Sequence, residues 1–260
     1  MAKIGLVLSG GMFKGLAHVG VLKVLEENNI KVDAIAGCSM GAIIGAFYAA
    51  GKTPQEIEEF VVKQNFRSVL SLSFSTLGFS KTPKLQHLIE TFSGVTKFRQ
   101  LKIPLYVNAT NITKEKEVVF SSGELYTAIR ASIAVPGFLA PKQIKNDLYI
   151  DGGALNNIPV SNLPHNIKKY IISNVLPTEK LDGKKTVSIK DLLEKGILIM
   201  MDELTKLRLK DVPKQNYVFI PTKITDGPAL PNEEKFRQII RKGEIAARKK
   251  IPKIKRKLLK

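Results

Sequence analysis

The sequence is poor in cysteine and histidine and has no long apolar run. Its single cysteine, Cys38, excludes an internal disulfide and suits a reducing compartment. No stretch approaches the ~20 apolar residues that a membrane-spanning helix needs. The chain enters a strand-like run directly after Met-Ala-Lys, without a secretory signal. These absences predict a cytoplasmic protein.

Low-complexity tracts, internal repeats and linker-like segments are also absent. The 260 residues are 44% hydrophobic and 25% charged, as expected of a globular protein with a large core. We expect one main domain over residues 1–232. Residues 233–260 form either a peripheral tail or a further part of the same domain.

Acidic residues are scarce, since 23 Asp and Glu oppose 41 Lys and Arg for a net charge of +18. Half of the excess lies in the tail, from Glu233 to Lys260, where twelve Lys and Arg oppose three Glu. Its apolar residues recur every three or four positions, which predicts an amphipathic helix kinked at Pro252. The helix could dock on the protein's own core or on an anionic membrane surface. No zinc-finger spacing or aromatic signature supports specific binding of nucleic acid.

Apolar runs of strand length alternate with helical patterns along the chain. Residues 3–8 and 32–36 predict strands, and a helix pattern follows each of them. This alternation predicts a three-layer α/β/α sandwich with a largely parallel central sheet. Further strands are expected at 105–110, 117–121, 148–150, 170–175 and 217–221, and helices at 54–63, 83–91, 124–132 and 188–209.

Two segments allow more than one interpretation. Residues 68–80 are uncharged and partly apolar, which fits a half-buried strand or loop, or a flap over a site that touches lipid. The helix expected at 188–209 begins close to a capping-box pattern. It contains an apolar run from Ile197 to Met201, which we interpret as core in preference to a membrane anchor.

The pentapeptide Gly37-Cys38-Ser39-Met40-Gly41 joins a predicted strand to a predicted helix. In a G-x-S-x-G elbow the chain turns sharply, and Gly37 and Gly41 are small because the two backbones crowd the nucleophile. Ser39 would then be exposed at the positive end of a helix as a nucleophile. A purely structural turn has the same composition.

A serine nucleophile needs a base, and Asp151 is the favoured one. It closes a short strand and precedes Gly152-Gly153, so that its carboxylate lies beside a backbone that bends freely. A buried carboxylate with a raised pKa takes a proton directly from a serine hydroxyl. An Asx turn is the structural alternative.

The three histidines are weaker candidates for the base. His165 follows Asp151 in the chain order of a Ser-Asp-His triad, but nothing around it is built to hold an imidazole. His18 borders the nucleophile turn and could simply pack there. His87 lies in a polar helix without catalytic context.

The glycine turn Gly10-Gly11-Met12-Phe13-Lys14-Gly15 follows the first strand. Its order fits neither a P-loop nor a dinucleotide fingerprint. Backbone N–H groups that converge at a helix start suit an oxyanion hole, which we assign to Gly10, Gly11, Met12, Lys14 and Gly15. Lys14 either adds positive potential or is simply solvated.

These motifs resemble the patatin-like phospholipases, a family of acyl hydrolases with a Ser-Asp dyad. The resemblance rests on Ser9 to His18, on the Ser39 pentapeptide, on Ala131-Ser132-Ile133-Ala134-Val135-Pro136-Gly137-Phe138 and on Asp151-Gly152-Gly153. It implies Ser39 as nucleophile, Asp151 as base, and the glycine turn as oxyanion hole. The chemistry requires no metal and no organic cofactor.

Two positions depart from the family's pattern. Met12 stands where a third glycine is common, and Cys38 where small hydroxyl residues are frequent; we interpret Cys38 as packing, with a reactive thiol as the alternative. The expected function is hydrolysis of lipid acyl esters, as a phospholipase A or lysophospholipase. The rivals are a soluble carboxylesterase or thioesterase, and a catalytically inactive protein that binds membrane surfaces.

Overall fold

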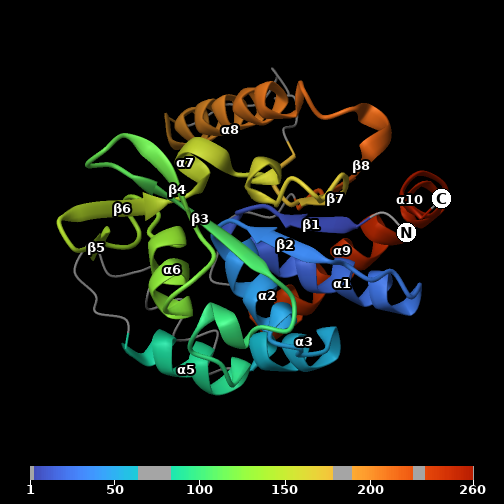
Figure 1. Cartoon of the computed structure of the whole chain (residues 1–260), viewed down its shortest axis with the longest axis horizontal. Coiled ribbons are helices and arrows are strands. Elements are labelled where there is room, and N and C mark those ends of the chain that lie inside the picture. Colours follow the sequence, from blue (N-terminus) through green and yellow to red (C-terminus); the bar gives the residue numbers. More distant parts are fainter. Residues whose placement is uncertain (1–2, 64–82, 178–188, 225–231, 260) are drawn as a thin grey trace.

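The fold is built around one mixed sheet, seen in a computed structural model that describes residues 3–63, 83–177, 189–224 and 232–259. Strand order is β5-β6-β3-β2-β1-β7-β8, and β4 pairs with β3 (Figure 1). The parallel strands are β1 (Ile4–Leu8), β2 (Ala34–Gly37), β3 (Leu105–Asn111), β7 (Lys169–Asn174) and β8 (Tyr217–Pro221). The antiparallel strands are β4 (Lys116–Phe120), β5 (Lys142–Ile144) and β6 (Asp147–Asp151).

Helices cover both faces of the sheet, which confirms the α/β sandwich (Figure 1). One side carries α7 (Gly153–Asn156) and α8 (Ile189–Leu209). The other carries α1 (Ala17–Glu27), α2 (Met40–Ala49), α3 (Pro54–Val62) and α9 (Glu233–Arg248). The remaining helices are α5 (Pro83–Ser93), α6 (Leu125–Ser132), α10 (Ile251–Leu258) and the short 3₁₀ turns η1 (Met12–Leu16), η2 (Phe98–Gln100), η3 (Val160–Asn162) and η4 (Lys214–Asn216).

Local sequence explains why these elements form. Every residue of β1 and β2 is buried, as expected for central parallel strands that helices cover on both faces. The helix α3 begins with a capping box in which Thr53 and Glu56 bond each other's backbone, and Pro54 takes the first helical position. Both signals are local, so these elements lie close to where the pattern predicts them.

The strand register brings two distant chain segments together. Gly37, the last residue of β2, pairs with Val107 of β3. Ala109, two residues farther along β3, pairs with Asp151, the last residue of β6. The ends of β2 and β6 therefore meet along β3, although 114 positions separate Gly37 from Asp151 in the chain.

The tail forms two helices that belong to the packed fold. The apolar face of α9 is buried, including Phe236 and Ile240, and Gly243 lies so close to Ala17 of α1 that an added Cβ would meet its carbonyl oxygen. The break falls at Lys249 and Lys250, just before Pro252, because proline favours the first turn of a new helix. The apolar face of the tail is therefore docked on the protein's own core, which is the first of the two alternatives given above.

The expectation that the run from Ile197 to Met201 is core is wrong for most of its residues. Within α8, Ile197 is 52% exposed, Ile199 48% and Met200 60%. The cause is that α8 lies on the surface of the sandwich, so only one of its faces meets the protein. Even so, no helix in the described ranges combines the length and apolarity needed to cross a membrane.

Strand β5 was not predicted, because its three residues, Lys-Gln-Ile, are too few to show an apolar alternation. The segment 68–80, interpreted above as a half-buried strand, loop or flap, lies outside the described residues.

Candidate active site

Ser39 occupies a strained turn between β2 and α2. Its φ of 53° and ψ of −122° lie in a region that non-glycine residues rarely adopt, at a cost of about 1–3 kcal/mol. The flanking glycines are required sterically: a Cβ on Gly41 would meet the Leu8 carbonyl, and one on Gly37 would lie 2.6 Å from the Gly41 oxygen. The conformation is the sharp strand-to-helix turn that the predicted nucleophile elbow requires.

A side chain from α6 holds this turn. The Ser39 backbone N–H donates to Ser132 Oγ at 2.8 Å, and Ser132 is fully buried. This bond gives an acceptor to a buried N–H that the strained turn directs away from the hydrogen bonds of the sheet. Ser132 belongs to a motif that carried the family resemblance, but nothing in the sequence indicated this contact.

Asp151 faces the elbow from the end of β6. Its Oδ1 accepts the Gly153 N–H at 2.7 Å and the Cys38 S–H at 3.7 Å. Its Oδ2 is buried and has no hydrogen-bond partner among the described residues. Burial raises the pKa of Asp151 to about 6, while the Ser39 hydroxyl, the Gly153 N–H and the Cys38 thiol oppose that rise. The geometry thus leaves carboxylate lone pairs open beside the serine.

Cys38 shares the Asp151 carboxylate but is not poised as a nucleophile. Burial, followed by the charge of Asp151, raises the pKa of its thiol well above the ordinary value. The group therefore stays protonated and donates to the carboxylate. This arrangement favours the packing interpretation over the reactive thiol.

The glycine turn lies against the elbow. A Cβ on Gly10 would lie 3.2 Å from Ser39 Cβ, and the Gly10 N–H makes only a long bond, 3.4 Å, to the Asn157 carbonyl. Within the described ranges, no hydrogen-bond acceptor is found for the N–H of Gly11 or of Met12, as expected at a helix start. Two N–H donors of the glycine turn, next in the chain to Gly10, therefore have no acceptor among the described residues.

The other residues of the predicted oxyanion hole serve the loop itself. The Lys14 N–H donates to the Gly11 carbonyl at 3.0 Å. Gly15 packs on α2, since a Cβ there would lie 2.5 Å from Met40 Cβ. Met12 takes a φ of 48°, a conformation that favours glycine, so the departure from the family's third glycine introduces backbone strain.

His18 is buried behind the glycine turn and anchors it. Its Nε2 lies 2.9 Å from the Ser9 carbonyl and its Nδ1 2.8 Å from Ser173 Oγ. Because a carbonyl only accepts, Nε2 carries the proton and Nδ1 accepts from the Ser173 hydroxyl. Burial lowers the pKa of His18 to about 4, although the Ser9 bond opposes this, so the imidazole is neutral at pH 7. Through these two hydrogen bonds, His18 positions the glycine turn.

The other two histidines lie away from Ser39. His165 is exposed and precedes β7, whose first residue, Lys169, pairs with Ile4 at the amino end of β1. Ser39 lies at the opposite, carboxyl end of the parallel strands. His87 is exposed on α5. The geometry therefore does not bring a histidine into a triad with Ser39.

Comparison with known proteins places the chain in a family. The model of the patatin-like phospholipases matches residues 6–163, which include the glycine turn, the elbow and Asp151. The chain belongs to this family. The patatin-like match ends before β7, and so it leaves α8 and the tail uncharacterised.

Curated relatives of this patatin-like chain are longer proteins. An uncharacterized NTE family protein of Mycobacterium tuberculosis is 36% identical over 162 residues, which is 61% of this chain and 45% of that protein. Lysophospholipase NTE1 of Scheffersomyces stipitis is 34% identical over 176 residues, 65% of this chain and 11% of that one. Lysophospholipase NTE1 of Cryptococcus neoformans is 27% identical, with 96% of this chain and 17% of that one. The chain therefore spans less than half the length of these relatives.

Solved structures share the patatin-like fold at low identity. VipD from Legionella pneumophila superposes with a TM-score of 0.55 at 13% identity, over 97% of this chain and 67% of that one. The type III effector protein ExoU gives a TM-score of 0.52 at 14% identity, over 97% of this chain and 53% of that one. These similarities concern the fold alone.

Behind Ser39 and Asp151 of this patatin-like chain, a polar cluster holds the Asp151 turn. Asn108 Nδ2 of β3 donates to the Asn156 carbonyl at 2.8 Å and to the Gly152 carbonyl at 3.4 Å. A Cβ on Gly152 would lie 2.6 Å from the backbone carbonyl oxygen of Asn108, so the glycine permits the close approach of the Asp151 turn to β3. Glu117 of β4 accepts from Asn108 and Asn156 and thereby ties two strands to α7.

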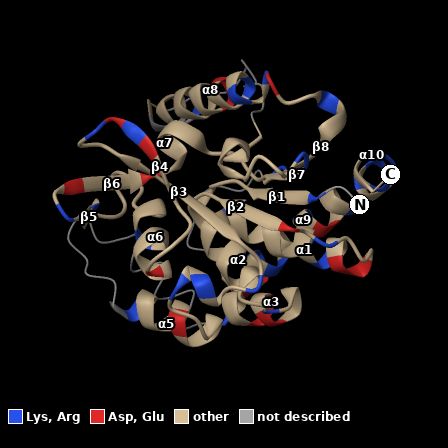
Figure 2. Ribbon diagram, in the orientation of Figure 1, with Lys and Arg blue, Asp and Glu red and all other residues tan. Residues whose placement is uncertain are grey.

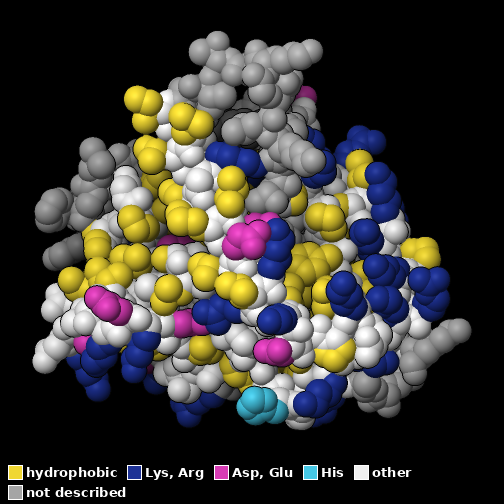
Figure 3. All heavy atoms as spheres, turned by 90° about the horizontal axis from the view of Figure 1, so that it is seen from above, with side chains coloured by type: hydrophobic (Ala, Val, Ile, Leu, Met, Phe, Trp, Pro, Cys, Tyr) yellow, Lys and Arg dark blue, Asp and Glu magenta, His cyan; other side chains and the backbone are white. Residues whose placement is uncertain are grey.

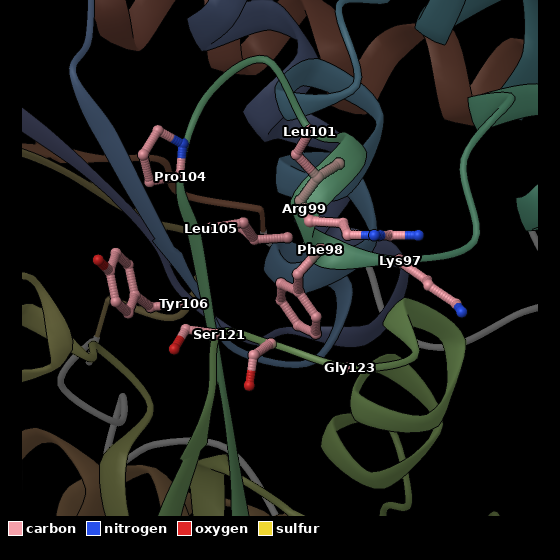
Figure 4. A pocket seen from close by; sticks show the side chains of 10 residues that line it. Lys97, Phe98, Arg99, Leu101, Pro104, Leu105, Tyr106, Ser121 and Gly123 are labelled. Atoms are coloured by element: carbon pink, nitrogen blue, oxygen red, sulfur yellow. The ribbon is translucent and has the colours of Figure 1, made fainter.

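A pocket of about 590 Å³ lies elsewhere, at the amino end of β3 (Figure 4). Phe98, Leu105 and Tyr106 line it. Because Leu105 pairs with Ile35, near the start of β2, this pocket is at the opposite edge of the sheet from Ser39. Across the described segments, no group of His, Cys, Asp and Glu could hold a metal ion.

Proposed function

We propose that this chain is a serine hydrolase of lipid acyl esters, of the phospholipase A or lysophospholipase type. The observation that carries the proposal is that the strained, buried Ser39 lies close to the buried Asp151, whose Oδ2 lacks a hydrogen-bond partner in the described structure. Family membership supports the lipid substrate class. Two of the relatives are named lysophospholipases.

In the proposed first half-reaction, Ser39 Oγ passes its proton to Asp151 and attacks the ester carbonyl carbon. The carbonyl oxygen becomes an oxyanion, which accepts hydrogen bonds from the Gly11 and Met12 N–H groups. Collapse of this intermediate breaks the ester C–O bond. The leaving alcohol takes the proton from Asp151, and an acyl-Ser39 ester remains.

In the second half-reaction, water replaces the alcohol. Asp151 accepts a proton from the water as it attacks the acyl carbon, and the same two N–H groups bind the oxyanion again. Collapse breaks the bond to Ser39 Oγ, which recovers its proton from Asp151. The fatty acid leaves, and the site returns to its starting state.

The tail residues 233–260 remain a proposed contact with anionic lipid. Because the apolar face of α9 is packed in the protein, the contribution of the tail rests on charge, from exposed residues such as Lys249, Lys253 and Arg256. Peripheral attachment of this kind weakens with salt.

The decisive experiment labels the protein with a fluorophosphonate, which reacts with activated serine hydroxyls. We expect labelling of the wild type and none of Ser39→Ala, whereas the exposed Ser122→Ala and His165→Ala keep wild-type labelling. Equal labelling of Ser39→Ala and wild type would contradict the proposed nucleophile and favour the inactive membrane-binding protein.

Substrate class is tested separately with phospholipid and lysophospholipid vesicles. Release of fatty acid by the wild type, and none by Ser39→Ala, is the expected result. Activity confined to short soluble esters or thioesters would instead identify the soluble carboxylesterase or thioesterase.

A further inference from the structure

Helix α8 presents an apolar stripe to solvent. Ile189 is 79% exposed, Leu193 65%, Met200 60% and Leu207 65%, and their spacing of four, seven and seven residues places them along one side of the helix. Leu192, Ile197, Ile199 and Leu204 widen the stripe, each at least 36% exposed. A surface helix normally turns charged residues to solvent, and contiguous exposed apolar residues mark interaction sites.

The opposite side of α8 already has its partners. Thr205 is buried and Leu209 packs on a hydrophobic cluster beneath the helix. Arg208 forms an ion pair with Glu117 at 3.3 Å. The exposed stripe is therefore additional to the face that holds α8 on the protein, and packing of the described core does not account for it.

The stripe lies beside the candidate active site. Met201 of α8 reaches the Asp151 turn, since its Cε would lie 3.4 Å from a Cβ on Gly153. The Arg208–Glu117 ion pair joins the helix to the polar cluster that positions the same turn. Any partner surface that binds the stripe is therefore held close to Ser39.

Charge flanks the stripe on one side. Lys206 is neutralised by Asp202 at 2.8 Å and Glu203 at 2.7 Å, so the stripe itself carries little net charge. A groove of about 400 Å³ beside it is lined by Lys210 and Lys214 and by the Lys206–Asp202 ion pair, so that Lys210 and Lys214 supply its positive charge.

The basic border continues onto α10. Lys257 donates to the Lys214 carbonyl at 2.9 Å, which places the end of the tail beside the groove. Figure 2 marks Lys and Arg on α10 and on the part of α8 nearer to it. Seen from above, hydrophobic side chains gather on this face, and Lys and Arg gather on the side where α10 lies (Figure 3).

We propose that this face docks on an anionic phospholipid bilayer, with α8 lying in the plane of the interface. Apolar side chains enter the boundary between headgroups and acyl chains, while the flanking lysines meet lipid phosphates. A second copy of the chain is disfavoured as occupant, because two surfaces of a protein with a net charge of +18 repel each other. An anionic lipid surface attracts the same charge.

The proposal goes beyond hydrolysis, because docking needs no reaction, and its test uses the Ser39→Ala background so that lipid is not consumed. Binding is measured by co-sedimentation with vesicles of phosphatidylcholine and phosphatidylglycerol. The polar variant Leu193→Gln/Met200→Gln/Leu207→Gln is compared with the apolar control Leu193→Met/Met200→Leu/Leu207→Met. Circular dichroism verifies that both are folded.

We expect the polar variant to bind roughly tenfold or more weakly, because three side chains lose their insertion energy, and the apolar control to bind like the parent. Equal binding by the polar variant would overturn the proposal. So would a parent that fails to bind vesicles but forms a dimer lost in the polar variant, since the stripe would then be a self-association surface. A failure of hydrolysis in the Ser39 wild type affects none of these results.

Discussion

At the scale of single residues, Asp151 sets the pH range of the proposed reaction. A base must be ionised to accept the Ser39 proton, and burial raises the pKa of Asp151 to about 6. We predict that kcat/KM is low under acidic conditions and rises with pH through about 6 to a plateau. The measurement is the pH–rate profile on a soluble ester, which separates this ionisation from lipid binding. A profile flat between pH 5 and 7 would contradict Asp151 as the base.

The same raised pKa has a cost in stability. A carboxyl group whose folded pKa lies above its unfolded value stabilises the folded state only at low pH, and this contribution is lost as the pH rises through the folded value. For a shift from 3.8 to about 6, the loss at pH 7 is on the order of 3 kcal/mol. We predict that Asp151→Asn is inactive yet more stable than the wild type at pH 7, and no more stable near pH 3. Urea unfolding at both pH values measures it.

Met12 offers a second test at this scale, since its φ of 48° strains a residue that carries a Cβ. We predict that Met12→Gly raises the free energy of unfolding by about 1 kcal/mol and preserves the esterase activity, because glycine keeps the backbone N–H. Glu115→Gly is the matched control, with a φ of 52° far from the elbow in the β3–β4 turn. Loss of activity in Met12→Gly alone would mean that the Met12 side chain, and not its N–H, serves the site.

Single residues also show the limit of motif reasoning. Ser39 and Asp151 could be proposed from the sequence because each stands in a local pattern of strand end and glycine, and their roles remain predictions. Ser132, Asn108 and His18 act through partners that lie 93, 48 and 155 positions away in the chain. Such contacts depend on strand register, which the sequence pattern alone does not determine.

At the scale of elements, β3 positions the proposed base through Asn108. Its amide donates to the Asn156 and Gly152 carbonyls, so Asn108→Ala releases the turn that carries Asp151. We predict a lower kcat with KM nearly unchanged, and a stability loss of about 1–3 kcal/mol. Kinetics on a soluble ester and urea unfolding measure the two effects.

The control for this prediction lies on the same strand. Asn111 Nδ2 donates to Asp147 at 3.0 Å, away from the elbow. Asn111→Ala should therefore lose stability without losing kcat. Equal kcat in Asn108→Ala and wild type would show that the turn holds Asp151 without help from β3.

Elements differed in how well the pattern predicted them. The buried strands β1 and β2 carry continuous apolar runs, and α3 carries its own start signals, so local sequence was sufficient. In α8 the same kind of apolar run points outward. Periodicity identifies an apolar face but not what covers it, and the expectation of a core run failed for that reason.

At the scale of the whole molecule, net charge separates the two proposed lipid contacts. Half of the +18 lies in the tail, whose apolar face is packed on α1, whereas α8 offers apolar area with little charge of its own. Contact through the tail is therefore expected to be salt-sensitive, and contact through α8 mainly area-dependent. The two contributions can be removed independently.

The variant Lys249→Gln/Lys253→Gln/Arg256→Gln changes three exposed positions and leaves the fold intact. We predict that it binds anionic vesicles more weakly than the wild type at low salt. At high salt its binding is expected to be close to that of the wild type. The reason is that screening already removes the tail's contribution there, while the α8 stripe still inserts. Co-sedimentation across a salt series measures this. Truncation before Glu233 is no substitute, because it would remove the buried face of α9. A charge variant that binds like the wild type at every salt concentration would exclude the tail from the membrane contact and leave α8 as its source.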